Sequence, residues 1–304
     1  MIGYIFVALA LAFGATKGYC GKRTSGCAAH ASDAMAINSV RMLLCIFIGL
    51  FMVLIQGNAA YLGITAEVLL ITLLSGVGTA VFTVSWLMAV RKSAYMLLDV
   101  FVLAGVTIPM LLCLLLYGEP ITLVQWIGIA ILIIAGYIMC TYNKSINGKM
   151  TLSGFLLLIL CALSNGITDF SQKLFVRSAP DIPISVFNLY TYAFSAAVLI
   201  VCCILFRLGE KSHAEGGERT SVVGTVKPIL GYIVIMAICL FLNSYFKTAA
   251  AVHLTAVQLY PLNSGAALVI AMLMARFLFH EKLNLKAIIG AVLGFAALIL
   301  INFF

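Results

Sequence analysis

The chain has 304 residues, of which 64% are hydrophobic and only 9% are charged. A soluble globular domain typically carries about 25% charged residues, so this composition excludes a soluble fold and indicates a polytopic membrane protein. The formal net charge of +8 is therefore interpreted as loop charge facing a membrane surface, and nucleic-acid binding is excluded.

Ten apolar runs are long enough to cross a membrane, because about 30 Å of hydrocarbon takes roughly 17–25 helical residues. They are 2–18, 36–56, 65–90, 94–117, 121–141, 151–172, 183–206, 228–247, 249–279 and 284–303. The first run precedes the first positive charge, Lys17, which predicts a retained span instead of a cleaved signal peptide. We expect an all-α polytopic membrane protein with ten transmembrane helices.

An internal repeat relates the two halves of the chain. Residues 85–140 align with 247–302 without a gap, and this alignment pairs Glu119 with Glu281. Both glutamates directly precede an apolar run, where a carboxylate satisfies free N–H groups, so we interpret them as structural. Five spans in each half is an odd number, so the second half enters the membrane from the opposite side.

Such an inverted repeat places the substrate site of a transporter at the repeat interface. We predict two inverted five-helix repeats, the first at 1–142 and the second at 151–304, with a linker at 143–150.

The aligned segments carry a family likeness. Each has small residues entering a span, then an apolar run, a Glu, a short turn and an apolar run with Gly. Segments 89–138 and 251–300 thereby resemble the EamA module of the drug/metabolite transporter superfamily. The resemblance implies a transporter of small metabolites, drugs, amino acids, nucleotide sugars or quaternary amines, and no enzyme. One departure is informative: the family's proline is present as Pro261, but the matching position in the first half is Asp99.

Charged side chains inside the apolar runs are candidates for function, since Asp or Lys at a helix centre costs roughly 2.5–3.5 kcal/mol. We favour Asp99 as a cavity-facing cation partner or proton carrier, against an acid that reaches the headgroups. For Asp169, a cavity role and an interfacial cap are equally favoured. Lys17 is interpreted as a snorkelling residue, and Lys247, between two apolar runs, as a loop charge.

Aromatic side chains beside polar groups make an organic cation a plausible substrate, since cation–π contacts contribute about 0.5–2 kcal/mol each. Packing or an interfacial belt is the alternative for any one of them. Pro261 leaves the carbonyl of Val257 without its helical partner and predicts a helix kink facing a wet cavity. The candidate substrate contacts are Asp99, Trp86, Asn165, Asp169, Tyr190, Tyr245, Gln258, Tyr260 and Asn263.

The chain has no catalytic signature, nucleotide-binding motif or metal-ligand spacing, so we expect no enzyme activity, cofactor or metal. The expected function is secondary transport of a small polar or cationic metabolite by alternating access. The expected partners are that substrate, membrane lipids and a coupling proton or ion. A carrier of neutral metabolites or amino acids is the alternative, and a non-transporting membrane partner or lipid-metabolism protein is another class.

The distribution of positive charge predicts the orientation in the cell membrane. The loops after odd-numbered spans, with Arg41 close by, hold 15 Lys and Arg, against 3 in the even-numbered loops. The positive-inside rule then places both termini outside. The family resemblance implies cytoplasmic termini, so both orientations stay open.

Overall fold

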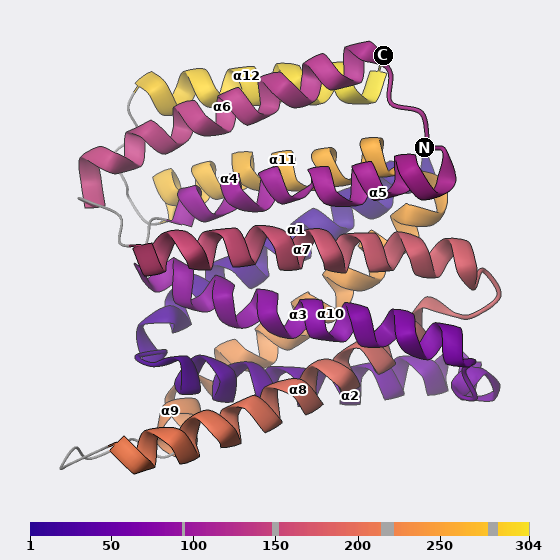
Figure 1. Ribbon diagram of the computed structural model, residues 1–304, viewed down its shortest axis with the longest axis vertical. Coiled ribbons are helices and arrows are strands. Elements are labelled where there is room, and N and C mark those ends of the chain that lie inside the picture. Colours follow the sequence, from indigo (N-terminus) through magenta and orange to yellow (C-terminus); the bar gives the residue numbers. More distant parts are fainter. Residues whose placement is uncertain (93–94, 148–151, 214–221, 279–284, 304) are drawn as a thin grey trace.

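The computed structural model describes residues 1–92, 95–147, 152–213, 222–278 and 285–303, which are helical almost throughout (Figure 1). The first half contains α1 (Ile2–Thr24), α2 (Ala31–Ile55), α3 (Ala66–Lys92), α4 (Tyr95–Gly105), α5 (Thr107–Tyr117) and α6 (Leu123–Asn147). The second half contains α7 (Leu152–Ser178), α8 (Ile184–His213), α9 (Val222–Val226), α10 (Leu230–His253), α11 (Ala256–Phe277) and α12 (Leu285–Phe303). Short 3-10 helices are η1 (Ser25–Cys27), η2 (Asn58–Leu62) and η3 (Lys227–Ile229), and these described ranges contain no strand.

Seven helices in the described ranges are long and apolar enough to cross a membrane, and they correspond to α1, α2, α3, α7, α8, α10 and α11. Three shorter apolar stretches, Phe101–Tyr117, Leu123–Ala135 and Ile288–Asn302, lie where the sequence predicts the remaining spans. The all-helical, membrane-spanning class is therefore confirmed, whereas the count of ten spans and the inverted repeat stay predictions.

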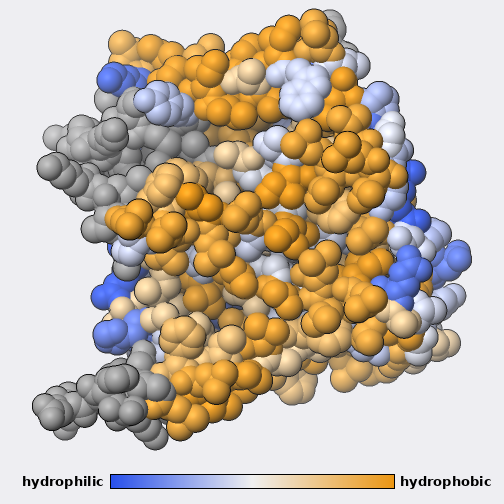
Figure 2. All heavy atoms as spheres, viewed as in Figure 1, coloured by the Kyte–Doolittle hydropathy of each residue, from blue (hydrophilic) through white to orange (hydrophobic). Residues whose placement is uncertain are grey.

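The outer surface of the bundle is apolar. Figure 2 shows hydrophobic residues covering most of the visible face, with hydrophilic residues gathered near its edges. Large side chains such as Phe47, Leu115 and Val292 are 70%, 77% and 64% exposed. Soluble monomers rarely expose apolar patches beyond a few hundred Å², so this surface belongs to an integral multi-pass membrane protein.

The helices pack in pairs. At one side of the bundle α6 packs against α12, and at the other α2 packs against α8 (Figure 1). Between these pairs, α1 packs on α10 and α3 on α7, while α4 contacts both α7 and α11 and α1 also contacts α11. The helices of this central group surround the candidate site.

A proline and two glycines bring α4 and α7 into close contact. Pro109 has no N–H for the carbonyl of Gly105, and α4 ends at that residue. A Cβ added at Gly105 would lie 2.2 Å from the Ala162 carbonyl oxygen, and one at Gly166 would lie 2.6 Å from the Gly105 oxygen. The two backbones therefore approach so closely that a side chain at either position would collide.

Two predicted boundaries differ from the structure. Helix α10 continues to His253 and α11 starts at Ala256, so Lys247, predicted to be a loop charge, lies inside α10. The sequence could not show this, because the apolar runs on both sides leave the turn unmarked by charge. Helix α6 continues to Asn147, into the predicted linker at 143–150, whose last residues lie outside the described ranges.

Candidate functional site

A cavity of about 130 Å³ lies among the central helices. Its lining residues come from α1, α3, α4, α7, α8, α10 and α11, so both halves of the chain contribute. The lining is largely polar on α7 and α10, where it includes Asn165, Thr168, Gln172, Asn243 and Ser244. Such buried polar groups are costly in a membrane protein and typically mark a substrate or ion pathway.

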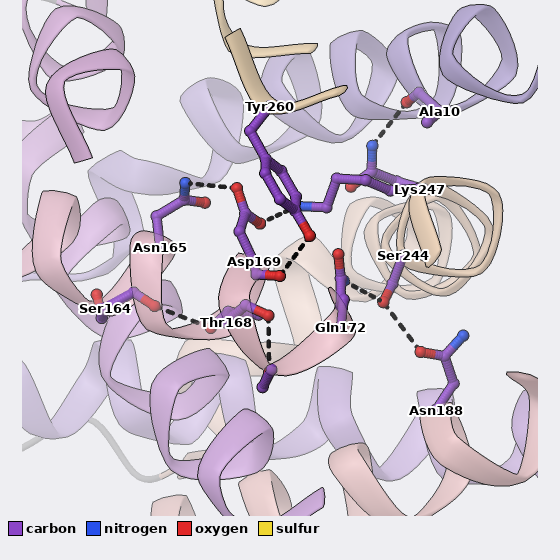
Figure 3. Close-up of polar contacts among 12 residues, drawn as sticks. Ala10, Ser164, Asn165, Thr168, Asp169, Gln172, Asn188, Ser244, Lys247 and Tyr260 are labelled. Carbon is purple, nitrogen blue, oxygen red and sulfur yellow. Dashed lines mark hydrogen bonds and ion pairs between the residues drawn. The ribbon is translucent and has the colours of Figure 1, made fainter. Parts of the chain in front are cut away.

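A buried ion pair joins α7 to α10 beside the cavity. The Nζ of Lys247 lies 2.5 Å from Oδ1 of Asp169, and the two side chains are 10% and 1% exposed. The amide of Asn165 donates to Oδ2 of the same carboxylate at 3.2 Å, and the Tyr260 hydroxyl donates to the Asp169 backbone carbonyl at 2.5 Å (Figure 3). Asp169 thus connects α7 to α10 and α11.

Further hydrogen bonds extend this polar contact toward α8 and α1. The Gln172 amide donates to the Ser244 hydroxyl at 3.3 Å, and that hydroxyl donates to Oδ1 of Asn188 at 3.0 Å (Figure 3). The Asn243 amide donates to the Ala10 carbonyl of α1 at 2.6 Å. One wall of the cavity therefore carries several polar side chains that are held by hydrogen bonds between helices.

The other charged groups in the lining are Lys17 of α1 and Asp99 of α4. Both are partly buried, and within the described ranges neither has an ion-pair partner at 4.0 Å or less. They are close enough to interact electrostatically across the cavity. These two side chains therefore present opposite charges to whatever occupies it.

The indole of Trp86 borders the cavity where α3 crosses α1. A Cβ added at Gly21 would lie 2.5 Å from Cζ3 of this ring, so only glycine leaves room for the indole there. Phe82 and Tyr192 are the other aromatic residues of the lining within the described part of the chain.

A second charged cluster, the Glu119 cluster, ties the α5–α6 connection to α7 and α11. The Glu119 carboxylate accepts from Arg177 at 2.9 Å, lies 3.3 Å from Nζ of Lys173, and accepts from the Ala256 backbone N–H at 2.8 Å. The Lys173 ammonium also donates to the carbonyls of Ala251 and Leu254, at 3.0 and 2.7 Å. The cluster therefore joins the C-terminal ends of α7 and α10 to the first turn of α11.

The pKa of Glu119 reflects this environment. Burial raises it, but the hydrogen bonds from Ala256 and Arg177 and the positive charge of Lys173 outweigh burial, so the pKa lies below its ordinary value of 4.5. The carboxylate is therefore ionised at neutral pH and accepts a hydrogen bond from the Ala256 N–H at the start of α11.

The nine predicted substrate contacts occupy three kinds of position. Those that line the cavity are Trp86, Asp99, Asn165 and Asn263. Those in the network behind the lining are Asp169 and Tyr260.

The remaining three form hydrogen bonds outside the cavity lining. The Tyr190 hydroxyl donates to the Leu62 carbonyl at 2.6 Å, and the Tyr245 hydroxyl accepts from Gln56 at 3.2 Å. The Gln258 side chain accepts from the Thr255 backbone N–H at 3.3 Å, at the start of α11. Pro261, the predicted kink, lies inside α11. Which of the nine contact substrate stays a prediction.

Sequence reasoning missed the cationic side of the site. It interpreted Lys17 as a snorkelling residue and Lys247 as a loop charge, but both line the cavity. A signal was present in the sequence, because residues 14–22 also align with residues 166–174. This second alignment of the repeat pairs Lys17 with Asp169, a candidate site residue.

The fold and this cavity define a class, an integral membrane protein with a buried polar site between its helices. Residues 152–303, half of the chain, match the model of the EamA-like transporter family. The chain belongs to that family, which is part of the drug/metabolite transporter superfamily. Proteins of the family are transporters and not enzymes, so the chain is a membrane transporter of this type.

Solved structures share the fold. One, described only as a crystal structure of a protein, has a TM-score of 0.72 and 13% sequence identity, and the match covers 98% of this chain and 95% of that one. At this identity the likeness concerns the fold alone. No curated protein matches the sequence.

Proposed function

We propose that the protein is a ten-span secondary transporter of the cell membrane that carries a small polar metabolite through the central cavity by alternating access. The observation that carries the proposal is the buried polar cavity, whose lining comes from both halves of the chain. A polar site at this position matches the substrate sites of transporters built from inverted repeats.

The packing of the helices supports two related halves. In this comparison, the helices of the first half correspond in order to those of the second: α1, α2, α3, α4–α5 and α6 to α7, α8, α10, α11 and α12. Each contact between two helices then has a counterpart between the two corresponding helices. The contact of α1 with α10 then corresponds to that of α7 with α3, and the contact of α4 with α7 to that of α11 with α1. The pairs α2–α8, α6–α12 and α4–α11 each correspond to themselves, as expected for two five-helix repeats at 1–142 and 151–304.

Alternating access also requires one end of the cavity to be closed while the other is open. The Glu119 cluster holds α7, α10 and α11 together at the ends where α7 and α10 finish. The lining residues of α7 and α10 lie in the halves nearer the cluster, and those of α1, α3 and α11 lie mostly in the halves farther from it, so the cavity occupies the middle of the bundle. Passage of a substrate out of the cavity at the Glu119 end would therefore require the cluster to break.

Asp99 and Asp169 are our candidates for a coupling proton, since an intramembrane carboxylate is a common proton carrier. Uptake into sealed proteoliposomes, measured from pH 5 to 8 over a panel of metabolites, tests the proposal. We expect saturable uptake of at least one solute, with Asp99→Asn changing its pH dependence. Unchanged transport in Asp99→Asn would remove the coupling role of that residue. Absence of uptake for every solute would instead contradict secondary transport of a small polar metabolite.

A further inference from the structure

We infer that the cavity binds a short organic acid, whose carboxylate is held at Lys17, in preference to a quaternary amine. This inference rests on the proposed transport function and names its substrate class. It also reverses the sequence-based preference for a cation, for reasons that lie in the charges around the cavity.

The first reason is which charges remain unpaired. Lys247 and Asp169 neutralise each other, and within the described ranges Lys17 and Asp99 have no ion-pair partner at 4.0 Å or less. Arg41 of α2, only 4% exposed, interacts electrostatically with Lys17, and its Nε has no hydrogen-bond partner among the described residues. Two cations against one anion leave a net positive charge at the cavity.

The second reason is how a substrate would change that balance. Moving charge out of water is costly unless it meets an opposite charge and hydrogen bonds. A monoanion compensates the excess positive charge and accepts hydrogen bonds from the Lys17 ammonium. A quaternary amine would add positive charge beside Lys17 and Arg41, and it has no N–H to donate to Asp99.

The third reason is the arrangement of aromatic rings. Recognition of a quaternary amine typically uses several aromatic faces around the cation. Of the tyrosines that suggested such a site, Tyr190 and Tyr245 lie outside the lining, where each forms a hydrogen bond with another part of the chain. The aromatic lining within the described ranges is Phe82, Trp86 and Tyr192, and the Tyr192 hydroxyl donates to the Leu240 carbonyl.

Asp99 then supplies the second contact. Its carboxylate accepts a hydrogen bond from the substrate hydroxyl, while the substrate carboxylate binds the Lys17 ammonium. A short 2-hydroxy acid provides both groups on adjacent carbon atoms and carries one net negative charge, and a molecule of this size suits a cavity of about 130 Å³.

The two tryptophans of the chain allow a direct binding test. Trp86 lines the cavity, whereas Trp126 is 40% exposed on the outer surface of α6. In a Trp126→Phe background the fluorescence of purified protein reports on Trp86 alone. Lactate, glycolate and 2-hydroxybutyrate would be titrated against their amides and against choline.

We expect at least one acid to change the Trp86 emission saturably and its amide to bind at least tenfold more weakly. Equal or tighter binding of an amide or of choline would overturn the inference, as would the absence of saturable binding by any of the acids. The comparison uses the native cavity, so it does not depend on any substitution at the site.

Variants then locate the carboxylate. Lys17→Gln is expected to weaken acid binding about tenfold or more, and Lys17→Arg to retain most of it. Lys22→Gln removes a charge from the same helix outside the lining and is the matched control. An unchanged affinity in a folded Lys17→Gln would overturn the assignment to Lys17. Acid binding without uptake in vesicles would refute transport alone, whereas uptake of a quaternary amine but no acid would refute this inference alone.

Discussion

The pair formed by Asp169 and Lys247 is the most deeply buried ionic contact of the central cavity. Removing one partner leaves an uncompensated charge, which in a protein interior costs about 3–5 kcal/mol. We therefore expect Asp169→Asn to lower the apparent free energy of unfolding by about that amount, measured as a fall in the thermal midpoint of detergent-purified protein.

The double variant Asp169→Asn with Lys247→Met separates a structural pair from an isolated acid. Replacing both charges removes the unpaired lysine, so we expect the double variant to regain most of the lost stability. If it is as unstable as the sum of the single variants, the pair does not account for the stability of this contact.

The contact between α4 and α7 depends on glycine at one crossing. A Cβ at Gly105 would lie 2.2 Å from the Ala162 carbonyl oxygen, and overpacking of this kind typically costs about 1–3 kcal/mol. We expect Gly105→Ala to lower the thermal midpoint and to reduce substrate binding, since α4 carries Asp99 into the cavity.

A matched glycine substitution is available on α10. Gly231 is exposed in the first turn of that helix, with no atom within 4 Å of an added Cβ. Ala has a higher helix propensity than Gly by about 1 kcal/mol in a helix interior, so Gly231→Ala should leave stability unchanged or raise it. Equal losses in both variants would contradict a specific close contact at Gly105.

The stability that the Glu119 cluster gives to the helix ends it joins depends on pH. Because the folded pKa of Glu119 lies below 4.5, its stabilising contribution is complete above about that pH and is lost as the pH falls through the lowered value. We expect the native protein to be more stable than Glu119→Gln at pH 7, and this difference to shrink as the pH falls from 4.5 to 3. Thermal midpoints across that range measure it, and a constant difference would show that the carboxylate charge is not responsible.

The sequence predicted the elements better than the contacts between them. Span positions follow from runs of apolar residues, so the helical class was predictable and is confirmed. The α10–α11 boundary was not, because Thr255 and Gln258 begin the new helix inside an unbroken apolar run.

Side-chain partners depend on which helices adjoin, and one chain cannot reveal that. Asp169 could be flagged as an acid in a span, but its lysine partner lies 78 positions away on another helix. Glu119 was correctly interpreted as capping free N–H groups, yet the group it caps is Ala256 of α11 and not the start of the next helix. Its repeat mate, Glu281, lies outside the described residues.

The orientation of the whole bundle in the membrane gives the last prediction. The sequence assigns 15 Lys and Arg to the loops at one end or close to them, against 3 at the other. Without Lys17, Arg41 and Lys247, which lie in or near the cavity, the counts are 13 against 2, and such a bias places the richer end in the cytoplasm. The 3-10 helices η2 and η3 lie at opposite ends of the bundle, and each has an exposed residue, Tyr61 and Lys227.

After replacement of the nine native cysteines, Tyr61→Cys and Lys227→Cys report the two ends separately. We expect a membrane-impermeant thiol reagent to label Tyr61→Cys in intact cells and to label Lys227→Cys only after the cells are opened. Labelling of both in opened cells controls for accessibility. The reverse pattern in intact cells would place the termini in the cytoplasm, as the family resemblance implies. The end that the Glu119 cluster holds together would then face the cytoplasm.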